Sequence, residues 1–221
     1  MNFVRRLAPL AGAVALMSAA LPLHAQRFGI MAGATFSNLR SSEDLDLERR
    51  NGTIFGATLQ LPLGAKIALQ PELLFLNKGA KFRDPIGNQG NNQSVRLDYL
   101  EIPVLLRYDF SREVIGPHIY AGPSIGFNLN CQVQFGGNGA EAGATTDCGN
   151  DDFKPKTLDY GLTVGAGVDL NLGGLALTTG VRYGLGLADI RNDDSDEFQS
   201  RVNNGTVAIY LGVLFGSLKK D

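Results

Sequence analysis

Hydrophobic and polar residues alternate with period 2 along most of the chain, and this alternation returns in eight separate runs. One parity of each run is apolar and the other is mostly small or polar, which is typical of strands with one apolar face. No convincing 3.6-residue periodicity predicts helices in their place. The runs cover residues 28–36, 55–63, 67–75, 100–108, 119–129, 158–170, 175–187 and 207–215.

The lengths of the runs and of their connections distinguish a soluble β-sandwich from a membrane-spanning β-barrel. A soluble sandwich also alternates, with its apolar face inward. Most of these runs reach about 9–13 residues, the length that a tilted strand needs to cross a bilayer, whereas soluble strands average about 5–6. Short periplasmic turns that alternate with long extracellular loops are typical of an outer-membrane barrel. The short connections here lie near 64–66, 109–117 and 171–174, and the long polar ones near 38–53, 77–96, 131–157 and 189–205.

The aromatic residues of the apolar parity fall mainly at two heights along the predicted strands. Aromatic rings favour the two membrane interfaces, so two such girdles indicate a lipid-facing surface, with only Tyr183 falling between them. The sequence therefore predicts an all-β fold, an eight-stranded antiparallel up-and-down transmembrane β-barrel. The outer girdle comprises Phe36, Phe55, Phe75, Phe127 and Tyr160, and the periplasmic one Phe28, Tyr108 and Phe215.

Four prolines fit a closed barrel less well. Pro71, Pro103 and Pro123 lie inside predicted strands, and Pro62 lies near the end of one. Each removes a donor from the ladder, and a closed barrel has no free edge on which that loss is harmless. We expect either bulges at these points or a locally irregular barrel.

The first 25 residues have the three-part pattern of a secretory signal peptide. Arg5 and Arg6 precede an uncharged stretch, 7–23, which is short for a membrane anchor of roughly 20 apolar residues. Cleavage after Ala25 or, alternatively, after Ala20 would release the mature chain. The predicted organisation is a signal peptide, 1–25, followed by an outer-membrane β-barrel domain, 26–221.

The charge balance argues against a nucleic-acid partner. The chain has 20 Lys and Arg against 22 Asp and Glu, and the signal peptide contains two of the Arg, which leaves 18 − 22 = −4 for the mature chain. A weakly acidic protein has no electrostatic reason to bind nucleic acid. The predicted location is the bacterial outer membrane.

Five segments together resemble the outer-membrane β-barrel domain family that includes PorT-like proteins, common in Bacteroidetes-type bacteria. The likeness covers essentially the whole mature chain. It implies an outer-membrane barrel and little about biochemistry, because most members have no assigned activity. The chain departs from many such barrels at its end, where 216–221 follow Phe215, the last outward aromatic. The segments are LQPELLFLNKGAK (69–81), LDYLEIPVLLRYDF (97–110), IYAGPSIGF (119–127), DYGLTVGAGVDL (159–170) and GVRYGLGLADI (180–190).

Candidate catalytic residues are sparse. His118 is the single histidine after the signal peptide, and it would face inward near the periplasmic end, whereas an outer-membrane lipid hydrolase needs its base at the outer leaflet. Thr35 and Ser37 lie near the outer rim without a histidine partner, and no metal-spaced cluster appears. We therefore expect no enzyme activity, no cofactor and no metal site.

Inward charges are more informative. Glu72, Glu101, Arg107 and Arg182 all have the inward parity and are expected to form a charge cluster in the lumen. An eight-stranded interior is just wide enough for side chains to fill, and opposite charges there should pair. We expect Glu72 and Glu101 to share Arg182. The cluster is interpreted as a plug or, alternatively, as an electrostatic gate that opens to ions.

Cys131 and Cys148 are the only two cysteines, and both lie in the third long loop. Disulfides persist in the compartment to which the chain is exported, so we predict a disulfide between them. Two free thiols remain the alternative at this stage.

The long polar loops, such as 41–50 and 192–198, carry whatever recognition the protein performs. The leading hypothesis is an outer-membrane barrel with a structural or interaction role, which displays these loops and docks envelope partners. The alternative is a narrow pore or a secretion-system accessory. A lipid-modifying enzyme ranks third. The expected surroundings are outer-membrane lipid and envelope protein partners.

Overall fold

The computed structural model describes residues 26–40, 47–82, 92–136, 145–148, 157–187 and 203–216, and every regular element among them is a strand. These residues contain no helix of the length and apolarity needed to cross a membrane. The predicted signal peptide, 1–25, lies outside the described residues. The strands are β1 (Arg27–Arg40), β2 (Leu47–Pro62), β3 (Ile67–Phe82), β4 (Asn92–Asp109), β5 (Ile115–Gly136), β6 (Thr145–Asp147), β7 (Leu158–Asn171), β8 (Leu175–Gly186) and β9 (Asn203–Phe215).

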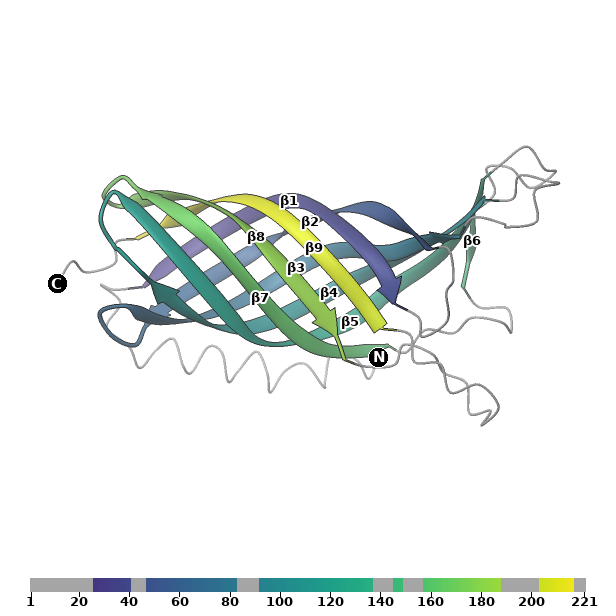
Figure 1. Ribbon diagram of the computed structural model, residues 1–221, viewed down its shortest axis with the longest axis horizontal. Coiled ribbons are helices and arrows are strands. Elements are labelled where there is room, and N and C mark those ends of the chain that lie inside the picture. The colour runs from purple at the N-terminus through teal and green to yellow at the C-terminus, as the bar shows by residue number, and fades with distance from the viewer. Residues whose placement is uncertain are drawn as a thin grey trace, which may run out of the picture.

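Eight long strands close into an antiparallel barrel, as predicted. The sheet order runs β4-β3-β2-β1-β9-β8-β7-β5, and a further pairing between β4 and β5 closes it. The first and last strands meet along β1 and β9, from Phe28 opposite Phe215 to Arg40 opposite Asn203. The short turns lie at one end of the barrel, on the left of Figure 1, and the other end carries the ninth, short strand β6 beside β5. By the usual rule the short turns face the periplasm.

The strands on one side of the barrel are longer than the sequence predicted. β3 continues to Phe82, β4 begins at Asn92 and β5 ends at Gly136, although the corresponding segments were expected to be loops. Pairing continues there through polar residues, for example Ser94 opposite Gln134, so no apolar alternation marks it. As a result β4 and β5 project beyond the other strands at the extracellular end (Figure 1).

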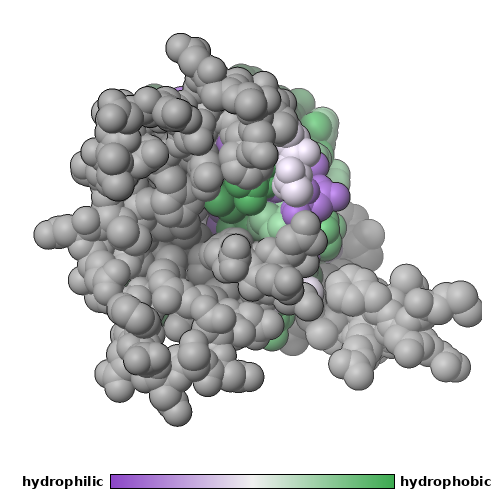
Figure 2. Space-filling model, turned by 90° about the vertical axis from the view of Figure 1, so that its right-hand side faces the viewer, coloured by the Kyte–Doolittle hydropathy of each residue, from purple (hydrophilic) through white to green (hydrophobic). Residues whose placement is uncertain are grey.

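The predicted outward parity is confirmed by exposure. Val104, Ile209 and Leu211 are 40%, 50% and 68% exposed, as expected for side chains that face lipid. The inward parity is more apolar than predicted: Leu97 and Leu105 are fully buried inside the barrel. Such inward apolar residues pack together inside the barrel, and hydrophobic residues are visible near the centre of the end of the molecule that faces the viewer in Figure 2.

Of the two expectations for the prolines, bulges or a locally irregular barrel, the second is observed: pairing is interrupted beside Pro71, Pro103 and Pro123 without a bulge. The register is the same on both sides of Pro103, with Pro103 opposite Ser124 and Leu106 opposite Ala121. The described register shifts instead fall between Arg49 and Ile54 and between Asp98 and Tyr99. Both shifts lie toward the extracellular end, where the long strands leave the regular barrel.

Inward glycines on β7 and β8 make room for large side chains from other strands. A Cβ on Gly165 would lie 2.4 Å from the Tyr120 ring, and one on Gly180 would lie 2.6 Å from the Tyr210 hydroxyl. Real Cβ atoms essentially never approach so closely, so a side chain at either position would force its tyrosine to move. The glycine-rich wall thus positions the tyrosines that line the middle of the lumen.

Candidate functional site

The charged side chains that point into the barrel form three layers along its axis. Each layer contains at least one cation and one carboxylate in contact. The periplasmic layer comprises Arg27, Arg107, Asp109, Arg112 and Asp169; the middle layer Glu72 and Arg182; and the extracellular layer Lys78, Glu101 and Asp159.

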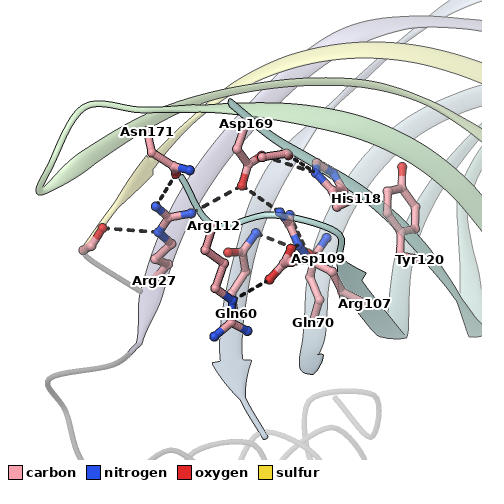
Figure 3. A network of polar contacts seen from close by, with 12 residues as sticks. Arg27, Gln60, Gln70, Arg107, Asp109, Arg112, His118, Tyr120, Asp169 and Asn171 are labelled. Atoms are coloured by element: carbon pink, nitrogen blue, oxygen red, sulfur yellow. Dashed lines mark hydrogen bonds and ion pairs between the residues drawn. The ribbon is translucent and has the colours of Figure 1, made fainter. Parts of the chain in front are cut away.

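Arg107 on β4 is the centre of the periplasmic layer (Figure 3). Its Nε donates to Asp109 Oδ1 at 2.6 Å, and its Nη2 donates to Asp169 Oδ2 at 2.7 Å. Arg112, on the turn after β4, donates from Nε to the other oxygen of Asp109 at 3.0 Å. Arg107 and Asp109 are 2% and 1% exposed. Charge-assisted hydrogen bonds of this kind are the strong ones, and they fix the guanidinium across the lumen.

Arg27 joins this layer to the seam between the first and last strands. Its Nη1 lies 3.3 Å from Asp169 Oδ2, and its Nη2 donates to Asn171 Oδ1 at 2.5 Å. Its Nε donates to the carbonyl of Gly216, just after β9, at 3.3 Å. One side chain therefore connects β1, β7 and the end of β9.

His118 belongs to the same layer and not to a catalytic centre at the outer leaflet. It is 1% exposed, and its Nδ1 lies 3.3 Å from the Gly116 carbonyl and 3.6 Å from Asp169 Oδ1. Its ring stacks on Tyr120 at 6.0 Å. The inward, periplasmic position expected from the sequence is the one observed.

Arg182 in the middle layer is held by a carboxylate and two aromatic rings. Its Nη1 and Nη2 donate to the two oxygens of Glu72 at 2.7 and 3.1 Å. Its guanidinium lies 5.5 Å from the Tyr120 ring centroid and 5.0 Å from that of Tyr210. The Tyr120 hydroxyl donates to the Tyr210 hydroxyl at 3.2 Å. Together these side chains occupy the middle of the barrel with a desolvated, paired charge.

A chain of amides connects the middle layer to the periplasmic one. Gln70 donates from Nε2 to Glu72 Oε1 at 2.7 Å, and its Oε1 accepts from Gln60 Nε2 at 3.3 Å and from Arg107 Nη1 at 3.4 Å. The two layers therefore form one continuous hydrogen-bonded network.

The extracellular layer is centred on Lys78. Its Nζ lies 2.9 Å from Glu101 Oε2 and 3.7 Å from Asp159 Oδ2, and it sits 4.7 Å from the centroid of the Tyr99 ring. The Lys78 and Glu101 side chains are each 9% exposed and Asp159 is 4% exposed. The ammonium is thus held by two carboxylates and an aromatic face.

The expectation that Glu72 and Glu101 share Arg182 is wrong for Glu101. Arg182 pairs with Glu72, whereas Glu101 pairs with Lys78. The register explains the difference: Glu101 lies opposite Leu74, two residues above Glu72, which is about 7 Å along a strand. The two carboxylates are therefore in different layers.

Several members of the layers were missed by the sequence analysis. Lys78 has the same parity as Glu72, but the predicted strand ended at residue 75 and left it in a loop. Asp109 and Arg27 were missed at strand ends for the same reason. Asp159 and Asp169 have the inward parity, which was the signal available for them.

Together the layers can close the lumen. They hold five cations and five carboxylates, so the charges balance within these three layers. Among the described residues, no group of three or more His, Cys, Asp or Glu side chains is arranged to hold a metal ion.

The predicted disulfide between Cys131 and Cys148 is confirmed, with the two Cα atoms 5.3 Å apart. Its position differs from the one expected, because Cys131 lies on the extended part of β5 and not in a loop. The Cys148 amide donates to the Cys131 carbonyl at 3.0 Å, next to the pairing of β6 with Gln132–Gln134. The disulfide therefore fastens β6 to the edge of β5 above the barrel.

The chain resembles several solved bacterial barrels at low sequence identity. Neisserial surface protein A is 16% identical, with 85% of this chain and 96% of that chain covered and a TM-score of 0.48. OprG from Pseudomonas aeruginosa is 15% identical, with 88% and 98% covered and a TM-score of 0.48. Ail, the attachment invasion locus protein of Yersinia pestis, is 13% identical, with 86% and 99% covered and a TM-score of 0.42. No curated protein sequence matches the chain.

The family model described as outer membrane protein beta-barrel domain matches residues 19–192. This match spans more than half of the chain and takes in the strands from β1 to β8, including residues from all three charged layers. The chain therefore belongs to the outer membrane protein beta-barrel domain family and is a protein of the bacterial outer membrane.

Proposed function

We propose that this protein is a closed, non-conducting barrel with a structural and interaction role, which holds its extracellular segments above the membrane to dock envelope partners. The observation that carries the proposal is the filling of the lumen by three layers of paired charges in series. A barrel of eight strands leaves an interior only wide enough for its side chains, so these layers leave little room for a solute.

Opening such a lumen is energetically unfavourable. An ion that crosses must separate contacts such as Arg182 with Glu72, whose side chains are 5% and 0% exposed. Breaking one buried ion pair costs about 3–5 kcal/mol, because the charges left behind are uncompensated. The layers follow one another along the axis, so a single ion must cross each of these barriers in turn.

The interaction role is supported by the extracellular end. β4 and β5 project beyond the barrel, and β6 with its disulfide widens this projection by one strand. All three residues of β6, Thr145–Asp147, are exposed. A rigid, disulfide-fastened projection presents a defined surface to a partner at low entropic cost.

The alternative function is a narrow pore or a secretion-system accessory, as the resemblance to PorT-like members implied. It would require the layers to separate. We also propose that the barrel is not an enzyme, since His118 is held between Asp169 and Tyr120 inside the barrel.

Planar-bilayer conductance of the purified protein tests the proposal. We expect no discrete conductance steps from the wild type. The double variant Arg107→Ala/Arg182→Ala, which removes the two central guanidinium groups, should admit ions if it folds, and it provides the matched positive control. Stable, discrete steps from the wild type would refute the closed barrel and favour the pore.

Photo-crosslinking in intact cells tests the docking role separately. A photoreactive residue in place of exposed Thr145 should yield a discrete protein adduct, whereas the same residue in place of lipid-facing Val104 should yield none. Identical adduct patterns at the two positions would contradict docking at the projection.

A further inference from the structure

The periplasmic end contains a groove that the charged layers do not account for. It lies between the turn that joins β2 to β3 and the turn that joins β4 to β5, and it has a volume of about 480 Å³. Small-molecule sites usually have volumes of roughly 300–1,000 Å³. The groove is lined by Ala65, Lys66, Asp109, Phe110, Ser111, Arg112, Glu113 and Val114.

The backbone holds the two turns in place. The Asp109 amide donates to the Lys66 carbonyl at 2.8 Å, and the Phe110 amide donates to the Pro117 carbonyl at 3.0 Å. The Leu63 amide closes the first turn on the Ile67 carbonyl at 2.9 Å. The groove is therefore a fixed feature of the barrel end.

Two cations line the groove, one on each turn. Lys66 is exposed on the turn between β2 and β3, and Arg112 lies on the turn between β4 and β5. Arg112 donates from Nε to Asp109, and its Nη2 is buried without a hydrogen-bond partner among the described residues. Asp109 pairs with both Arg107 and Arg112. The lining charges of Lys66, Asp109, Arg112 and Glu113 sum to zero, but Asp109 is occupied by these two arginines, so the groove offers an anion the ammonium of Lys66 and the guanidinium of Arg112.

The groove is continuous with the lipid-facing wall of the barrel. Phe110 and Val114, which line it, are 52% and 59% exposed. Tyr108 packs edge-on against Phe110, with ring centroids 5.2 Å apart, and belongs to the predicted periplasmic girdle. Ile67 and Ile115 beside the groove are 41% and 63% exposed. An occupant thus meets two cations at its polar end and an apolar wall along its side.

We propose that this groove binds one anionic phospholipid of the periplasmic leaflet, with the lipid phosphate between Lys66 and Arg112 and an acyl chain along Phe110 and Val114. A phosphate accepts hydrogen bonds from a guanidinium and an ammonium at once. Arg112 Nη2 is buried, so the Arg112 side chain has to turn toward the groove to donate to the phosphate. The occupant could be a phospholipid or a segment of a soluble periplasmic protein. Because the groove continues into the lipid-facing wall of the barrel, a phospholipid fits it better than a soluble segment does. The proposal does not depend on whether the lumen conducts.

Native mass spectrometry of the full barrel in non-ionic detergent tests this proposal. With phosphatidylglycerol we expect one lipid to be retained in preference to phosphatidylcholine. Lys66→Gln should weaken retention about fivefold, the effect of one basic group near an anionic lipid surface, and Lys66→Arg should restore it. Arg96→Gln, which removes a partly exposed arginine at the opposite end, is the matched control and should bind as the wild type does.

Four results would overturn the proposal. Equal retention of the two lipids, or an unchanged affinity in Lys66→Gln, would remove the phosphate site. Displacement of the lipid by an equal concentration of glycerol 3-phosphate would show that the apolar wall contributes nothing. A photoreactive residue in place of Val114 should give a lipid-sized mass increase in cells, and a protein-sized adduct in its place would assign the groove to a periplasmic protein. Folding is checked in each variant by the gel mobility of the unheated barrel.

Discussion

Replacing Arg182 with Met tests how strongly the middle layer stabilises the barrel. The wild-type Glu72 carboxylate accepts two hydrogen bonds from Arg182 and one from Gln70, and its side chain is 0% exposed. Arg182→Met leaves only the neutral amide, so a buried carboxylate loses its counter-charge. Such a loss costs about 3–5 kcal/mol of unfolding free energy.

The reverse single substitution should be milder. Glu72→Gln leaves Arg182 between the rings of Tyr120 and Tyr210, and the amide oxygen still accepts a hydrogen bond from it. Desolvated cation–π contacts contribute about 2 kcal/mol, so we expect a loss of about 1–3 kcal/mol. The double variant Glu72→Met/Arg182→Met, which replaces the pair by apolar side chains, should recover most of the stability lost in Arg182→Met.

Urea titration of the barrel refolded in lipid vesicles measures these differences. The chain contains no Trp, so far-ultraviolet circular dichroism and the gel mobility of unheated samples serve as probes. The double-mutant cycle of Glu72→Met and Arg182→Met should give a coupling of at least about 2 kcal/mol, within the range measured for residues in contact. A double variant as unstable as the sum of Arg182→Met and Glu72→Met would refute the argument that pairing, and not the size of the side chains, holds this layer.

Three further substitutions test other parts of the fold. Val104→Arg, on the lipid-facing side, should cost about 2–4 kcal/mol in the same titration while Val104→Ala costs much less; equal losses would contradict the assigned face. Gly165→Ala places a Cβ 2.4 Å from the Tyr120 ring and should cost about 1–3 kcal/mol, a loss that a smaller residue at Tyr120 relieves; an additive double variant would argue against the contact. Reduction of Cys131–Cys148 should raise protease cleavage between the two cysteines and leave the barrel folded; loss of the folded gel mobility on reduction would show that the disulfide supports the barrel itself.

Much of the barrel follows from the alternation of apolar residues, because the lipid imposes an apolar outer face on every spanning strand. That signal stops where the strands leave the membrane. Ser94 and Gln134 pair above the membrane without any apolar pattern, so the sequence could not show how far β4 and β5 extend, nor that β6 joins them.

The alternation along each strand predicted which side chains face the lumen, but it could not predict which of them contact one another. The sequence predicted that Glu72 and Glu101 share Arg182, and the contact with Glu72 is observed, since both residues lie near the middle of long, unambiguous strands. Lys78 was missed at the end of such a strand, and the partner of Glu101 was therefore assigned to the wrong layer. Glu101 lies opposite Leu74, two residues away from Glu72, and this offset puts the two carboxylates in different layers. Only the register of β3 and β4 shows the offset.

The contacts of Arg27 have a consequence for the lifetime of the inserted protein. Its guanidinium reaches the Gly216 carbonyl after the last strand and Asp169 on β7, so these contacts form only once the first strand has met the last. Interactions that are absent until closure is complete do not accelerate insertion, and they act instead on the rate of reopening. Arg27 thus stabilises only the closed barrel. A chain that has not yet inserted β9 does not make the contact to Gly216, whereas the closed barrel unfolds more slowly because of it.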